Sequence, residues 1–470
     1  MRIKSLKHIF ISTLFLSLFC LSSFAQAPVS NKEVPKKTRV LFVFDCSGSM
    51  LATWEGDSRM NIAKKILGDL VDSLKSNKNV EIALRAYGHQ YDKVFQNCKD
   101  TKLEVPFSPK SHDQIKAKLK TLVPRGTTPI AYSMEQAAND FPNDPNFRNV
   151  IIIITDGLES CNGDPCALSL ALQKNRIFLK PFIIGLGADD DYGKAFDCMG
   201  QFFEAKTVAQ FKSVLGKIIN QTLNKTTVSV KLLDIYDKPT ETNVNVSFIN
   251  NVTGEVVYDF IHYLDPATNN TDTLQIDAVI SYDVMVSTIP PKIKRDVYLE
   301  GGKHNIVEVK TPQGTLNINF EGGGNDYKNL NAIIRQSDSL ETLHNYKVGS
   351  KEKFIVGTYD IEVLTLPRIS FNKVQINQNN ITNLKIAQPG VLSIPVATAG
   401  WGSLYQIVPN SGDHKWIYNF DGNSKVNMPM QPGDYKMVFR AKGTKGAKYT
   451  EVQYFTIKSG ATSLVKLNGK

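Results

Sequence analysis

The sequence has few cysteines, few histidines and few long apolar runs. Its 470 residues include six cysteines and seven histidines, and the last 270 residues have no cysteine at all. This asymmetry predicts two structurally different halves. After residue 24 no uninterrupted apolar run reaches about 18 residues, so no transmembrane span is expected in the mature chain.

Charge is also modest and evenly spread. Only 21% of residues are charged and 42% are hydrophobic, which excludes wholesale disorder, and the length predicts two to four domains. The net charge of +10 divides into +3 over residues 1–25, +2 over 26–38, +3 over 39–225 and +2 over 226–470. No segment concentrates positive charge, so nucleic acid is excluded as a partner.

The first 25 residues have the three parts of a secretory signal peptide. Met1–His8 has three basic residues and no acidic one, Ile9–Phe24 is apolar, and small residues surround Ala25. We expect cleavage after Ala25, which leaves residues 26–38 as a tether. A membrane anchor is the alternative, because the apolar run is near the lower length limit for a span. The cleaved chain would be secreted, periplasmic or at the cell surface, and it could associate peripherally with the cell envelope.

Cleavage would remove Cys20 and leave an odd number of cysteines. These are Cys46, Cys98, Cys161, Cys166 and Cys198. An oxidising compartment allows disulfides, and an odd count leaves at least one thiol free. Cys161 and Cys166 are expected to fix the loop around them, bonded to each other or to one of Cys98 and Cys198. A zinc site is disfavoured, because this pair has no second close pair or nearby histidine.

Short apolar runs alternate with helical patterns over residues 39–225. Strands separated by helices predict crossover connections, and therefore an α/β domain with a doubly wound, mostly parallel, Rossmann-like sheet. Strands are expected at 39–45, 80–87, 102–107, 150–155, 177–185 and 201–204, and helices at 59–76, 113–122, 130–138, 166–174 and 209–224. Ligands of such sheets bind beyond the carboxyl ends of the strands.

Carboxylates and hydroxyls follow two of these expected strands. Asp45-Cys46-Ser47-Gly48-Ser49 ends the first strand, Asp156 follows the strand at 150–155, and Thr128 lies on a loop before a helix. These side chains offer hard oxygen ligands, which suit Mg²⁺, Ca²⁺ or Mn²⁺ and suit zinc poorly. Two carboxylates beside neutral hydroxyls would leave the ion electrophilic, so it could accept one further carboxylate from a partner.

This pattern resembles the von Willebrand factor A (VWA) domain, in which these positions form the metal-ion-dependent adhesion site. The matching residues are Asp45, Ser47, Ser49, Thr128 and Asp156. Thr128 is preferred because it directly precedes Pro129, and Thr127 is the alternative. The stretches 86–89, 124–126 and 155–166 also resemble one bacterial branch of the family. The resemblance implies a metal-dependent protein-binding module, generally without catalysis.

Each candidate also has a simpler interpretation. Asp45 and Ser47–Ser49 could form an ordinary turn after a strand. His89 could be a catalytic base, but a single histidine after a strand is more often structural. Cys46 near His89 could be a nucleophile, although no oxyanion loop or orienting carboxylate is identifiable. Because no catalytic triad or acid pair is apparent, we do not expect an enzyme.

The second half of the chain repeats. Strand-like segments beginning at Tyr282, Tyr359 and Tyr435 are 77 and 76 residues apart and share an aromatic-polar-apolar-x-apolar pattern. Two-residue alternation replaces the helical pattern. We therefore expect three all-β sandwich-like modules, at residues 226–312, 313–388 and 389–470. Trp401 and Trp416 could form a carbohydrate platform, but aromatic residues in strands are usually core, so whether these modules bind glycan or protein stays open.

Two functions follow from this division. The first is an exported, non-enzymatic binding protein whose VWA domain holds a divalent ion that captures an acidic group of a protein partner. The second is a structural or accessory subunit of an envelope complex, in which the β-modules bind and the metal site is vestigial.

Overall fold

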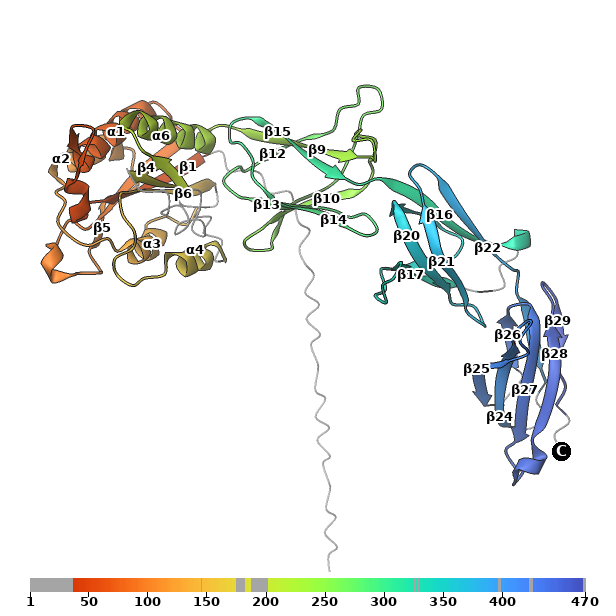
Figure 1. Ribbon diagram of the computed structural model, residues 1–470. Coiled ribbons are helices and arrows are strands. Elements are labelled where there is room, and N and C mark those ends of the chain that lie inside the picture. The colour runs from red at the N-terminus through yellow and green to blue at the C-terminus, as the bar shows by residue number, and fades with distance from the viewer. Residues whose placement is uncertain are drawn as a thin grey trace, which may run out of the picture.

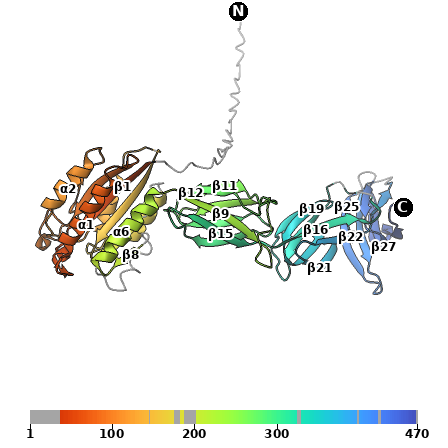
Figure 2. The ribbon, with the colours of Figure 1, turned by 90° about the horizontal axis from the view of Figure 1, so that it is seen from above.

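A computed structural model describes residues 37–144, 146–174, 182–186, 202–323, 327, 329–395, 399–421 and 426–467. The predicted signal peptide, residues 1–25, and most of the tether, 26–38, lie outside these residues. An α/β domain comes first, and three β-modules follow it in a row (Figures 1 and 2). No helix in the described part is long and apolar enough to cross a membrane.

A six-stranded sheet in the order β5-β4-β1-β6-β7-β8 forms the centre of the first domain. Neighbouring strands pair in parallel, except that β5 runs antiparallel to β4. The strands are β1 (Lys37–Asp45), β4 (Val80–Tyr87), β5 (Thr101–Val105), β6 (Phe147–Thr155), β7 (Phe182–Leu186) and β8 (Phe202–Ala205). The predicted α/β class is therefore confirmed. The start of the strand expected at 177–185 lies outside the described residues.

Helices cover both faces of this sheet (Figure 1). Side chains alternate between the faces along β1: Phe42 and Phe44 pack with α1, α2 and α6, whereas Leu41 and Val43 pack with α3 and α4. Burial on both faces explains why the central strands are almost entirely apolar. The helices are α1 (Arg59–Leu74), α2 (Ser111–Thr121), α3 (Ile130–Ala138), α4 (Pro165–Lys174) and α6 (Val208–Leu223). Between β1 and α1 lies a small hairpin of β2 (Thr53–Trp54) and β3 (Asp57–Ser58).

The remaining strands form three pairs of sheets with one shared topology. Each pair has a three-stranded and a four-stranded sheet, and its first strand lies between an antiparallel strand and the parallel last strand. This arrangement confirms the predicted sandwich-like modules, while the exact boundaries at 226, 313 and 389 stay a prediction.

The first module contains β9 (Thr226–Leu233), β10 (Asn245–Asn250), β11 (Val256–Ile261), β12 (Thr273–Ile276), β13 (Tyr282–Val286), β14 (Lys292–Val297) and β15 (His304–Lys310). The second contains β16 (Gln313–Phe320), β17 (Asn331–Gln336), β18 (His344–Lys347), β19 (Lys351–Ile355), β20 (Gly357–Val363), β21 (Ile369–Ile376) and β22 (Ile381–Ile386). The third contains β23 (Gly390–Ile394), β24 (Gly400–Ile407), β25 (His414–Asp421), β26 (Val426–Met430), β27 (Gly433–Ala441), β28 (Glu451–Ile457) and β29 (Thr462–Leu464).

The three repeated tyrosines are fully buried at equivalent places, one in each module core. Each hydroxyl donates to a backbone carbonyl oxygen shortly upstream: Tyr282 to Asp277 at 2.7 Å, Tyr359 to Ile355 at 2.6 Å and Tyr435 to Gln431 at 2.6 Å. A buried phenol needs such a partner, because an unpaired polar group in a core is costly. The sequence repeat therefore reflects one recurring structural device, a tyrosine that bridges the core and a neighbouring turn.

Backbone hydrogen bonds also join consecutive modules. The Ile355 amide donates to the Ile289 carbonyl oxygen at 2.7 Å, and the Gln431 amide donates to the Leu366 carbonyl oxygen at 2.7 Å. Between the α/β domain and the first module, the Arg148 guanidinium pairs with Asp277 at 3.0 Å. Since Ile355 and Gln431 also accept the tyrosine hydroxyls, each turn connects the core of its module to the preceding module.

We predict that Tyr359→Phe lowers the free energy of unfolding of the second module by about 1–2 kcal/mol, because the Ile355 carbonyl loses its side-chain donor. Hydrogen exchange in urea, read on peptides from residues 313–388, measures this loss, and peptides from 37–144 serve as an internal reference. The exposed Tyr454→Phe is the matched control and should change nothing beyond about 0.5 kcal/mol. Equal protection of the 313–388 peptides in wild type and Tyr359→Phe would contradict the prediction.

Candidate functional site

Strand order brings the predicted site residues to one edge of the sheet. Asp45 is the last residue of β1, and Asp156 directly follows β6, which pairs in parallel with β1. The carboxyl ends of parallel neighbours meet at the same edge. The loop with Thr128 reaches this edge through a backbone bridge between Ser47 and Gly126, and the Gly48 amide donates to the Gly126 carbonyl oxygen at 3.0 Å.

The Asp45 carboxylate is fully buried and accepts hydrogen bonds from three parts of the chain. The Ser47 amide donates to Oδ1 at 2.7 Å, and the hydroxyls of Tyr87 and Thr155 donate to Oδ2 at 2.9 and 2.7 Å. Burial, together with the charge of nearby Asp156, raises the pKa of Asp45 from 3.8 to about 6. At neutral pH the domain therefore holds a buried negative charge at this edge.

A chain of hydroxyls connects this region to Asp156. The Ser47 and Ser49 hydroxyl oxygens are 2.9 Å apart, and the Ser49 hydroxyl donates to Asp156 Oδ1 at 2.8 Å. A Cβ placed on Gly157 would lie 3.9 Å from both the Ser49 and Thr128 hydroxyl oxygens, so both face the same glycine. Ser49 is exposed, whereas the other predicted ligands are buried, so the cluster opens to solvent at Ser49.

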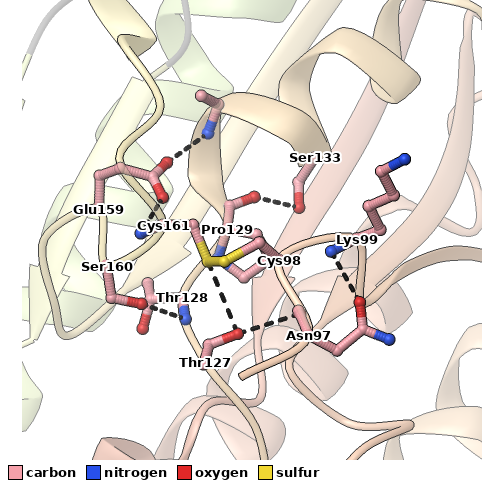
Figure 3. The surroundings of a disulfide bond; sticks show 11 residues. Asn97, Cys98, Lys99, Thr127, Thr128, Pro129, Ser133, Glu159, Ser160 and Cys161 are labelled. Atoms are coloured by element: carbon pink, nitrogen blue, oxygen red, sulfur yellow. Dashed lines mark hydrogen bonds between the residues drawn. A yellow bond between two sulfur atoms is a disulfide. The ribbon is translucent and has the colours of Figure 1, made fainter. Parts of the chain in front are cut away.

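The two candidate threonines point in different directions (Figure 3). The Thr127 hydroxyl donates to the Asn97 carbonyl oxygen at 3.1 Å, beside the disulfide, while the Thr128 hydroxyl faces Gly157 and Ser49. Thr128, the preferred residue, is therefore the threonine that lies with the other predicted ligands.

The disulfide joins Cys98 to Cys161, which is one of the predicted pairings (Figure 3). Cys166 is also disulfide-bonded, so the direct Cys161–Cys166 pair is wrong. Cys46 is the free thiol among the described cysteines, and it is buried. The Cys98–Cys161 bond ties the loop after β6 to the loop before β5, on the side of the cluster that carries Thr127.

The loop after β6 also holds the threonine loop through side chains that the ligand pattern did not single out (Figure 3). The Thr128 amide donates to the Ser160 hydroxyl at 2.8 Å, and the Ser160 amide donates to the Thr128 carbonyl oxygen at 3.2 Å. The two carboxylate oxygens of Glu159 accept from the amides of Ala131 and Cys161 at 2.7 and 2.8 Å. These residues position Thr128, and the only sequence signal for them was the family-like stretch 155–166.

Gly88 lies where the loops approach most closely. Its φ is +70°, and a Cβ there would lie 2.6 Å from the Thr127 carbonyl oxygen and 2.9 Å from the Ser47 amide nitrogen. A side chain would therefore push the serine and threonine loops apart, which explains why glycine follows Tyr87.

Arg59, the first residue of α1, is a further member of the site that sequence reasoning missed. Its Nη1 lies 2.9 Å from Asp156 Oδ2, and its Nε is buried without a hydrogen-bond partner. The cluster therefore already holds one cation of its own, and that cation contacts the carboxylate that an added metal ion would also use.

Of the two residues with catalytic interpretations, His89 is paired with a carboxylate and Cys46 is buried. His89 Nε2 lies 2.9 Å from Oε1 of Glu104 on β5. Burial raises the pKa of the Cys46 thiol well above its ordinary value, which disfavours the nucleophilic thiolate.

The donor chemistry fits a hard divalent cation better than zinc. Within the described residues, no group of three or more His, Cys, Asp or Glu side chains is placed to hold a metal ion. The cluster instead offers two carboxylates and three hydroxyls, oxygen ligands that suit Mg²⁺, Ca²⁺ or Mn²⁺. Its residues are Asp45, Ser47, Ser49, Thr128 and Asp156.

Comparisons with known proteins agree with this architecture. The family model of the von Willebrand factor type A domain matches residues 40–159, a range that includes all five cluster residues. The uncharacterized protein YwmD of Bacillus subtilis (strain 168) is 30% identical over 168 residues, or 35% of this chain and 74% of its own. YwmC of the same organism is 28% identical over 200 residues, or 40% of this chain and 87% of its own. Among solved structures, the conserved hypothetical protein BatB from Bacteroides thetaiotaomicron is 20% identical with a TM-score of 0.32, covering 39% of this chain and 97% of BatB.

We predict that Asp45→Asn stabilises the metal-free protein above pH 6. The folded state keeps the Asp45 proton up to about pH 6 and the unfolded state only up to about 3.8, so the carboxylate costs folding free energy increasingly between these values. The gain should reach at most about 3 kcal/mol above pH 6 and vanish below pH 4.

Denaturant unfolding in EDTA at pH 4 and pH 7.5 measures this difference, and Asp69→Asn, an exposed position on α1, is the control. A stability difference between wild type and Asp45→Asn that is the same at both pH values would contradict the assigned burial cost.

Proposed function

The chain belongs to the von Willebrand factor type A family, and we propose that its α/β domain binds a divalent cation, with Mg²⁺ the leading candidate, and through it an acidic group of a protein partner. The residues proposed to hold the ion are Asp45, Ser47, Ser49, Thr128 and Asp156.

One observation carries this proposal: two carboxylates and three hydroxyls from separate loops converge at one edge of the sheet. The Ser49 hydroxyl lies within hydrogen-bond distance of both Ser47 and Asp156, although Asp156 is 107 residues away in sequence. A bound ion would supply Lewis acidity at this edge. Asp45 and Asp156 would formally balance its charge, but Arg59 is already paired with Asp156, so the occupied site would keep one positive charge, which favours a carboxylate from outside the chain.

The surroundings of Cys46 and His89, the two side chains considered for catalysis, support a binding role without catalysis. Cys46 is buried with a raised pKa, and His89 is paired with Glu104. We further propose that the chain is exported through residues 1–25 and acts outside the cytoplasm, where the β-modules hold the α/β domain at a distance from their own attachment point. In the alternative role, an accessory subunit, the modules would carry the binding and the cation site would be unused.

We predict that Mg²⁺ raises the melting temperature of the α/β domain and that Asp45→Ala and Asp156→Ala each abolish the rise. Ligand binding to the folded state alone adds about 2.7 kcal/mol at a concentration of 100 times Kd. Melting curves in Mg²⁺ and in EDTA, followed for wild type and both variants, measure this effect. Identical wild-type curves in the two buffers would refute the cation site.

Capture from an envelope extract then separates the two roles. A partner retained by wild type in Mg²⁺, and lost in EDTA or with Asp45→Ala, supports metal-dependent binding. A partner retained equally in all three conditions supports the accessory role instead.

We also predict that Arg59→Gln tightens Mg²⁺ binding by about tenfold. The substitution removes a positive charge that contacts Asp156 and so competes with the ion. Titration of Mg²⁺ by calorimetry measures the change, and Lys65→Gln, an exposed position on the same helix, is the charge-matched control. Weaker Mg²⁺ binding by Arg59→Gln would show that Arg59 positions Asp156 rather than competing with the ion.

A further inference from the structure

The four-stranded sheet of the third module has an outer face unlike those of its two sister modules. Trp401 on β24, Trp416 on β25 and Tyr454 on β28 are 48%, 55% and 64% exposed. Large aromatic side chains exposed together on one face are unusual for a soluble module and mark interaction sites.

The core itself forces Trp401 outward. A Cβ on Gly402 would lie 2.2 Å from the Phe420 ring, and one on Gly400 would lie 2.3 Å from the Phe439 ring. The glycines on both sides of Trp401 thus make room for buried rings, and the tryptophan between them takes the outer face. Trp401 is therefore not a core residue, which corrects the simpler interpretation of this aromatic position.

Strand register arranges the outer side chains in rows across the sheet. One row crosses Trp416, Tyr405, Lys436 and Tyr454, in that order over β25, β24, β27 and β28. A second row pairs Trp401 with Arg440, four residues farther along the strands, or about 13 Å away. Between these rows, the polar side chains of Ser403 and Asn419 are joined by a hydrogen bond of 2.7 Å.

Cations lie against the aromatic rings of this face. The Lys436 ammonium is 4.6 Å from the centre of the Tyr405 ring, and the Arg440 guanidinium is 5.3 Å from that of Trp401. The Lys442 ammonium also lies near Trp401, at 5.9 Å. Such cation–π contacts favour a side-by-side arrangement of the rings and the charges.

The sister modules carry the opposite charge at the matching position. The residue after each repeated tyrosine points outward from the sheet, and it is Asp283 in the first module, Asp360 in the second and Lys436 in the third. Residues 389–470 contain ten Lys or Arg and four Asp or Glu, a net charge of +6, whereas residues 226–388 contain 15 and 19, a net charge of −4. The even +2 over the whole second half therefore conceals a strongly basic last module. Because all three modules share one topology, the fold does not require this charge.

We propose that the outer face of the β25-β24-β27-β28 sheet binds an acidic polysaccharide. The apolar faces of sugar rings would lie on Trp401 and Trp416, and sugar carboxylates would pair with Lys436 and Arg440. Two acidic side chains also face outward on this sheet: Asp421, paired with Trp401 in the strand register, and Asp434, two residues before Lys436 on β27, which accepts a hydrogen bond from the Thr456 hydroxyl at 2.6 Å. The three cations that lie against the rings, Lys436, Arg440 and Lys442, outnumber these two acids. A polysaccharide is chosen over a nucleic acid because the chain is predicted to be exported.

Affinity electrophoresis of the full chain in gels containing polygalacturonate tests this proposal, with a neutral glucan gel as reference. Wild type should be retarded in polygalacturonate alone. Trp401→Ala and Lys436→Asp should each weaken retardation by about tenfold or more, whereas Tyr298→Ala and Lys351→Gln, exposed control positions in the first and second modules, should change it less than twofold. Circular dichroism of each variant shows whether the fold is kept. If Lys436→Asp unfolds, Lys436→Gln, which removes the positive charge without reversing it, tests the role of the charge.

The outcomes are separable from those of the cation site. Polysaccharide binding should persist in EDTA and in Asp45→Ala, because the face belongs to another module. Absence of retardation, equal retardation by the neutral glucan, or retardation unchanged by Trp401→Ala and Lys436→Asp would each overturn the proposal. Stronger binding of a single-stranded oligothymidylate than of polygalacturonate would also overturn it and assign the face to nucleic acid.

Discussion

The buried carboxylate of Asp45 is the constraint on which the functional edge of the α/β domain depends. It ends the central strand, and it is held by donors from its own loop and from both neighbouring strands, β4 and β6. Each donor fixes a separate piece of backbone around a charge that burial makes costly. The same contacts that hold the charge also bring the serine loop and the Asp156 loop together, so the architecture and the candidate site have one common origin.

Sequence reasoning found the features that local patterns determine. Apolar runs ending in Asp45 and before Asp156 were sufficient to predict the strands, their shared edge and the oxygen-rich chemistry. Gly88 lies in the family-like stretch 86–89, but its role and that of Arg59 were missed, because both roles arise from a close approach between segments far apart in sequence. The choice between Thr127 and Thr128 also needed three dimensions, since adjacent residues of a loop point in different directions.

Prediction of the β-modules from sequence was limited in a similar way. The repeated tyrosines predicted three related modules, and each buried phenol performs the same task. Summing charge over the whole region, however, hid the contrast between Asp283 or Asp360 and Lys436, because a total charge contains no information on which face a side chain occupies. The charge counted module by module, together with position within the pleat, distinguishes the last module from the other two.

The pairing of first and last strands has a mechanical consequence. In every module these two strands are parallel, so the chain enters at one end of the pair and leaves at the opposite end. Tension along the chain therefore loads the hydrogen bonds between them in shear, all together, instead of peeling them apart one by one. The paired stretch is seven residues long in the first module, six in the second and three in the third. The third module has the shortest paired stretch to resist shear, so it is expected to yield before the other two when the chain is pulled.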